Sequence, residues 1–161
     1  MTFSFLYRNG SHKRKLALRL LAMPVPVLGL ALLTSGTGFA APPITVSQPW
    51  FRYLLPQVPA GGYMTLENTS DQPAVLTGAA SPACGMLMLH KTEQSGGMES
   101  MRAVSAVTVP AKGTFQFGPG GYHLMCMQPK MEVGKSVPVT LTFAGGQTVT
   151  TSFPVRNAKG Q

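Results

Sequence analysis

The chain has 161 residues and a formal net charge of +8. Five of its cations, at positions 8, 13, 14, 15 and 19, lie among the first 40 residues, which contain no acid, so the chain from residue 41 onward has a charge of 8 minus 5, or +3. The cations of that part are scattered singly, without the basic stripe that is typical of nucleic-acid-binding proteins, which argues against a nucleic-acid partner.

The first 40 residues have the pattern of a secretory signal peptide. A basic patch at residues 12–19 is followed at once by an apolar run over residues 20–33. This run is shorter than the roughly 20 residues needed to cross a bilayer, and Pro24 and Pro26 interrupt it, so no permanent membrane span is expected. Small residues precede a cleavage point after Ala40. No cysteine lies near this point, so nothing in the sequence suggests lipidation. We therefore expect a signal peptide over residues 1–40 and one exported, periplasmic domain over residues 41–161.

The exported part shows the pattern of an all-β domain. Short runs of valine, threonine, phenylalanine and leucine recur between glycine, proline and Asn/Asp/Ser clusters, and no sustained helical period interrupts them. The strands predicted in chain order are 44–52, 62–68, 74–80, 86–93, 106–109, 114–117, 122–127, 137–143 and 148–155. Turns are expected at 68–71, 118–121 and 145–146. This arrangement predicts a β-sandwich or small barrel.

Two of these strands have an unusual face. Side chains alternate across a strand, so MLMLH at residues 86–90 separates its leucines from its methionines and histidine, and YHLMCM at residues 122–127 separates Leu124 and Cys126 in the same way. The sulfur-and-imidazole faces contain Met86, Met88, His90, His123, Met125 and Met127. Between the two strands, SGGMESM is expected to form a glycine-containing loop that supplies Met98 and Met101.

This combination of side chains favours copper(I). Thioethers are soft, uncharged donors and imidazole is borderline, whereas structural zinc sites use several thiolates and calcium or magnesium sites use oxygens. Methionine is also a common filler of hydrophobic cores, so packing is the alternative for each methionine taken singly. The coincidence of both exported histidines with most of the methionines, on matching faces of two strands and one loop, favours a metal site.

The spacing within this cluster resembles that of the PCuAC family of periplasmic copper(I) chaperones. Ten residues separate His90 from Met101, twenty-one separate Met101 from His123, and one separates His123 from Met125. The flanking stretches AGGYMTLENTSDQPAVLTGAASP, GPGGYHLMCM and VGKSVPVTLTF also resemble the family, so the likeness extends over nearly the whole exported part.

The resemblance implies a fold, a site and a role. The fold would be a cupredoxin-like, Greek-key β-sandwich, and one exposed copper(I) ion would be held by His90, Met101, His123 and Met125. The role would be a non-enzymatic one: delivery of copper towards the dinuclear centre in the copper-bearing subunit of cytochrome c oxidase, alone or with a Sco-type protein. Copper buffering or tolerance, or a sandwich that binds no metal, are the alternatives.

Some features remain open at this stage. Met86, Met88, Met98 and Met127 match no ligand of the signature and are expected to pack or to act as auxiliary sulfurs. Cys84 and Cys126 could form a disulfide in an oxidising compartment, or Cys126 could bind the metal as a thiolate. Arg102 is a candidate for shaping the loop around Met101. A blue-copper electron carrier is disfavoured because no histidine follows Cys126, and an enzyme is disfavoured because no triad or carboxylate pair is evident.

Overall fold

The computed structural model describes residues 44–161, and the expected signal peptide over residues 1–40 lies outside them. The described residues belong to one compact unit, and all regular structure within them is strand. The strands are β1 (Ile44–Arg52), β2 (Ala60–Asn68), β3 (Ala74–Ala80), β4 (Met86–Ser95), β5 (Met98–Ala103), β6 (Val107–Val109), β7 (Gly113–Phe117), β8 (Tyr122–Met127), β9 (Ser136–Phe143) and β10 (Thr148–Arg156). No helix capable of crossing a membrane occurs in this range.

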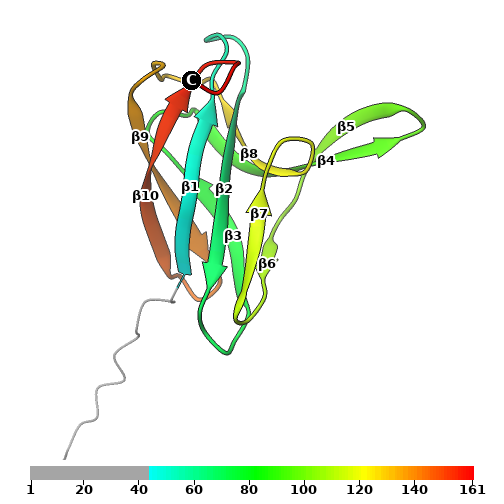
Figure 1. Ribbon diagram of the computed structural model, residues 1–161, viewed down its shortest axis with the longest axis vertical. Coiled ribbons are helices and arrows are strands. Elements are labelled where there is room, and N and C mark those ends of the chain that lie inside the picture. The colour runs from blue at the N-terminus through cyan, green and yellow to red at the C-terminus, as the bar shows by residue number, and fades with distance from the viewer. Residues whose placement is uncertain (1–43) are drawn as a thin grey trace, which may run out of the picture. The chain divides into compact units, whose positions relative to one another are not determined.

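The strands form one continuous sheet that folds over itself. Its order is β5-β4-β8-β2-β1-β10-β9-β3-β6, with β7 paired to β2 outside this path. The only parallel contact among the described strands joins β1 to β10, where Phe51 pairs with Val155, and the other pairings are antiparallel. Figure 1 shows the resulting arrangement, in which β1 and β2 lie beside β9 and β10. The predicted all-β sandwich is confirmed.

Alternation along the strands explains where the core lies. In β9 the residues Val137, Val139, Leu141 and Phe143 are all buried, and the residues between them are exposed or half-buried. The core formed in this way contains side chains from both halves of the strand order, among them Phe51, Leu66 and Leu124 in one half and Leu76, Leu141 and Phe153 in the other. Burial of these apolar side chains is the main stabilising contribution to such a domain.

The expected loop at SGGMESM is instead part of a β-hairpin, and this prediction was wrong. Strand β4 continues to Ser95, and β5 pairs with it in antiparallel register from Met98 to Ala103. Gly96 and Gly97 connect the strands with φ angles of 60° and 80°, the conformation that a tight two-residue hairpin turn requires. The hairpin of β4 and β5 extends away from the sandwich in Figure 1, and every residue of β5 is exposed. Because β5 buries nothing, its sequence shows no apolar alternation that would have predicted a strand.

Candidate metal site

The pairing of β4 with β8 brings the two histidines together. His90 lies directly opposite His123, Met88 opposite Met125, and Met86 opposite Met127. Directly opposed residues of an antiparallel pair point to the same face, so all six side chains share one face of the ladder, as the alternation predicted. The imidazole rings of His90 and His123 have centroids 5.8 Å apart. Beneath them Leu89 and Leu124 face the core, as predicted for the apolar face.

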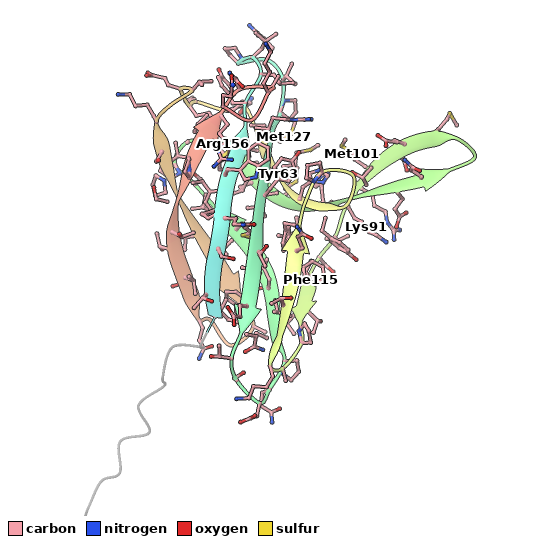
Figure 2. The ribbon with its side chains drawn as sticks, in the orientation of Figure 1. Tyr63, Lys91, Met101, Phe115, Met127 and Arg156 are labelled. Atoms are coloured by element: carbon pink, nitrogen blue, oxygen red, sulfur yellow. A yellow bond between two sulfur atoms is a disulfide. The ribbon has the colours of Figure 1, made fainter. Side chains whose placement is uncertain are left out.

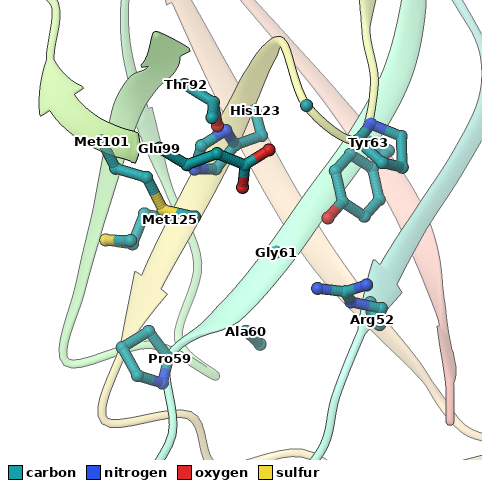
Figure 3. A pocket seen from close by; sticks show the side chains of 12 residues that line it. Arg52, Pro59, Ala60, Gly61, Tyr63, Thr92, Glu99, Met101, His123 and Met125 are labelled. Carbon is teal, nitrogen blue, oxygen red and sulfur yellow. The ribbon is translucent and has the colours of Figure 1, made fainter. Parts of the chain in front are cut away.

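Met101 reaches the same region from the hairpin. It lies opposite Thr92, and together with His123 and Met125 it lines a pocket of about 270 Å³. Figure 3 shows these three side chains on one side of the pocket. His90 is not part of the pocket wall, but its ring lies next to that of His123. The structure thus brings the four residues of the signature into one neighbourhood on three strands.

The donors differ in their access to solvent. His90 and His123 are only 9% and 6% exposed, Met125 is half-buried, and Met101 is 56% exposed. The imidazole nitrogens thus lie inside, whereas the thioether of Met101 lies at the surface. An ion held here would be reached from the side of Met101.

A backbone carbonyl sets the tautomer of His123. Its Nδ1 lies 3.0 Å from the carbonyl oxygen of Gly121, and since a carbonyl can only accept, Nδ1 carries the proton and donates. In the neutral ring the Nε2 atom then keeps its lone pair, the form in which imidazole binds a metal. The same carbonyl accepts the backbone N–H of Thr92 at 3.1 Å.

His90 has no hydrogen-bond partner among the described residues for either ring nitrogen, although both nitrogens are buried. Burial lowers the pKa of His90, and the nearby charge of His123 lowers it further, so the neutral ring with a free lone pair is favoured. A buried polar group without a partner is uncommon in a folded protein and calls for an explanation. A bound metal ion would supply a partner for one of the two nitrogens, the one with the lone pair.

The opposite wall of the pocket was not predicted from the sequence. It is formed by Arg52 and Tyr63, and the carboxylate of Glu99 points into the space between this wall and the sulfurs (Figure 3). Nε2 of Gln94 donates to Glu99 at 3.0 Å. Glu99 was missed because β5 was expected to be a loop; its spacing of two from Met101 would have placed both on one face of a strand.

Electrostatic contacts hold the other face of the hairpin. Glu93 accepts from Lys91 at 3.2 Å and from Arg102 at 3.1 Å, so the cation after Met101 pairs with an acid across the two strands. Met101 and Lys91 lie on opposite sides of the hairpin (Figure 2). Met98 is 75% exposed and, three residues from Met101, lies on the face away from the histidines.

The two cysteines form a disulfide. The sulfurs of Cys84 and Cys126 are bonded, with Cα atoms 5.3 Å apart, and the chain contains no further cysteine. The alternative in which Cys126 binds metal as a thiolate is therefore excluded in this oxidised form. Among residues 44–161 no three side chains of the His, Cys, Asp and Glu types gather into a metal-binding group, so the candidate site depends on its thioethers.

Comparisons with known proteins agree with this geometry. The profile of the LpqE-like family, described as "Putative lipoprotein LpqE-like", matches residues 44–155. A protein of Leifsonia xyli subsp. xyli named "Putative lipoprotein Lxx21020" is 35% identical over 131 residues, which cover 76% of this chain and 75% of that protein.

Solved structures of copper-binding domains have the same fold. The copper-bound PCuAC domain from PmoF2 superposes with a TM-score of 0.61 at 26% identity, covering 74% of this chain and 97% of that domain. The copper(I) form of DR1885 from Deinococcus radiodurans superposes with a TM-score of 0.56 at 37% identity, covering 74% of this chain and 83% of that one. The cupredoxin-like sandwich predicted from the sequence is confirmed, and the chain belongs to the LpqE-like family with a fold of the PCuAC type.

Proposed function

We propose that this protein is an exported copper(I)-binding metallochaperone in which His90, Met101, His123 and Met125 hold the ion. The observation that supports this most directly is the state of the histidines. His123 keeps Nε2 free by donating from Nδ1 to Gly121, and His90 is buried with neither nitrogen paired. Two imidazole lone pairs beside two thioethers form a donor set suited to copper(I).

The same donors suit a carrier that works outside the cytoplasm. Thioethers need no deprotonation, so they remain ligands in mildly acidic surroundings. Export to the periplasm, after cleavage of residues 1–40 from a domain of residues 41–161, is supported by the disulfide between Cys84 and Cys126, since such bonds persist in oxidising compartments. The lipoprotein names of the relatives also support export.

Unequal exposure of the donors suggests how the ion is released. Copper(I) is the cargo, so the protein must bind it and also surrender it. Met101 is exposed on the hairpin that extends away from the sandwich. An incoming donor readily displaces a neutral thioether from a metal ion. A ligand of the acceptor replaces Met101 first and Met125 next, while the buried histidines hold the ion until the last exchange.

We further propose that the acceptor is the dinuclear copper centre of cytochrome c oxidase, reached directly or through a Sco-type protein. The family resemblance and the exchangeable thioether side of the site support this proposal. The protein acts as a carrier and performs no catalysis in this scheme.

Copper(I) titration against a competing colorimetric chelator tests the binding site. The purified protein should take up one tightly bound equivalent, and the double variant His90→Ala/His123→Ala should compete poorly. Met98→Ala is the matched control, because this methionine lies on the other face of the hairpin, and it should bind as the unchanged protein does. Equal competition by the histidine variant would contradict the assignment.

A transfer experiment tests the acceptor. Copper-loaded protein mixed with the isolated copper-bearing domain of the oxidase subunit should lose its metal, and the absorption bands of the dinuclear centre should appear once the copper is partly oxidised. If the ion stays on the loaded protein while a chelator still removes it, the oxidase is not the acceptor, and copper buffering becomes the better description.

A further inference from the structure

The face that contains the two histidines continues along the β4–β8 ladder as a run of methionines. Met88 and Met125 form the next directly opposed pair after the histidines, and Met86 and Met127 form the pair after that. Met125 belongs to the proposed copper site, which leaves Met86, Met88 and Met127 without an assigned role. We propose that these three residues form a second, thioether-only site for a soft monovalent cation, Cu(I) or Ag(I).

The register places the three sulfurs within reach of a single ion. Directly opposed side chains have Cβ atoms about 4.5–5.5 Å apart, and diagonal neighbours are close enough for long side chains to meet. Met86 is opposed to Met127, and Met88 is its neighbour two residues along the same strand face. Methionine has three rotatable side-chain bonds, so the thioethers can converge on an ion without movement of the backbone.

Exposure distinguishes these residues from methionines that only pack. Met64 and Met131 lie in the core with 2% and 7% of their surface exposed, as expected for gap-filling side chains. Met86 is 57% exposed, and Met88 and Met127 are half-buried. Three thioethers on one accessible face do not fill a core gap, but they can receive an ion from solution.

The backbone around this run of methionines is held firmly. The disulfide connects Cys84, two residues before Met86, to Cys126, the neighbour of Met127. The N–H of Gly85 donates to the carbonyl of Met127 at 2.9 Å. These bonds keep the start of β4 in register with the end of β8, so the donors are positioned before the ion arrives, which lowers the cost of binding.

The second site has a specific relation to the first. Successive residues on one face of a strand are about 7 Å apart, so Met88 and Met125 stand one such step from the histidines and one step from Met86 and Met127. An ion at the outer site can pass from sulfur to sulfur to the inner one by ligand exchange. With thioethers alone the outer site binds more weakly and fills second. Its existence does not depend on the proposed function, because different residues form it.

Silver(I) titration followed through methionine methyl signals tests this site. The purified protein, labelled with ¹³C at the methionine ε-methyl groups, is titrated with silver nitrate in chloride-free buffer, since silver is a soft ion that does not change its redox state. The first equivalent should shift the signals of Met101 and Met125, and the second should shift those of Met86, Met88 and Met127.

Three variants identify the donors. Met86→Leu/Met127→Leu keeps the bulk of both side chains but removes their sulfurs, and it should weaken the second equivalent at least about tenfold and leave the first unchanged. His90→Ala/His123→Ala should abolish the tight equivalent but keep the shifts of Met86 and Met127. Met98→Leu, which alters an exposed methionine off this face, should keep both equivalents.

Each outcome has a defined meaning. Saturation after one equivalent, or a second equivalent that survives in Met86→Leu/Met127→Leu, overturns the outer site and leaves the proposed function intact. Persistence of the tight equivalent in the histidine variant contradicts the proposed function instead, whatever happens at Met86 and Met127.

Discussion

Replacing His90 with leucine should stabilise the metal-free protein. His90 is 9% exposed and both of its ring nitrogens lack partners among the described residues, and leaving a buried polar group unpaired costs about 1–3 kcal/mol. Leucine has similar bulk and no polar atom to desolvate, although it fits the space less well than the ring. We therefore expect the free energy of unfolding to rise by about 1–2 kcal/mol, while copper(I) affinity falls.

His123→Leu is the matched control. His123 lies directly opposite His90 on the same face and is similarly buried, but its Nδ1 donates to Gly121. Loss of that hydrogen bond should lower the free energy of unfolding by about 0.5–1.5 kcal/mol. The two variants should thus change stability in opposite directions and copper(I) affinity in the same direction.

Urea denaturation of the metal-free proteins, in the presence of a chelator, measures both effects. Trp50 is the single tryptophan and packs against Tyr63 with ring centroids 4.8 Å apart, so its fluorescence reports unfolding. If His90→Leu destabilises the protein as much as His123→Leu does, the nitrogens of His90 are satisfied in solution, and the argument from unpaired atoms fails.

Three other predictions follow from the described contacts. Replacing Cys84 and Cys126 with alanine removes a cross-link of 42 residues and should lower the free energy of unfolding by about 4 kcal/mol on the chain-entropy relation; a loss below about 1 kcal/mol in urea titrations would show that the cross-link contributes little. The lowered pKa of His90 means that the unfolded chain, in which histidine has a pKa near 6.5, binds more protons than the folded protein in the window below that value. The free energy of unfolding of the metal-free protein should therefore keep its full value above that pH and decline as the pH falls through it. His90→Leu should flatten this decline, and an equally steep decline in the variant would contradict the role given to His90. A Cβ at Gly62 would lie 2.7 Å from Cε1 of Phe51 in the core, so Gly62→Ala should destabilise the protein by about 1–3 kcal/mol, and an unchanged melting temperature would contradict this.

Most of the fold could be predicted because its strands bury one face. The expected strands 44–52, 74–80 and 122–127 have the observed bounds, and the other six differ by at most two residues at either end. Strand β5 was missed for a physical reason, because all of its side chains are exposed. Backbone pairing with β4 and the ion pair of Glu93 hold it in place, and neither contact can be recognised in the hydrophobic pattern of the sequence.

The candidate site was predictable in part. Alternation indicated which side chains share a face, but it could not indicate the register that sets His90 opposite His123. The disulfide stayed open because the direction of Cys84, before the start of β4, could not be derived from periodicity. Arg52 and Tyr63 lie on β1 and β2, which supply none of the four candidate ligands, and only the tertiary structure places them across the pocket.

The carbonyl of Gly121 accepts hydrogen bonds from both the backbone N–H of Thr92 and Nδ1 of His123. No amino-acid substitution can remove a backbone carbonyl, so this control over the imidazole proton is protected from point mutation in a way that a carboxylate partner would not be. A graft of the four signature side chains onto another scaffold would lack this hydrogen bond to the imidazole. A working copy would have to reproduce the path of the chain from Gly118 to His123 as well as the ligands.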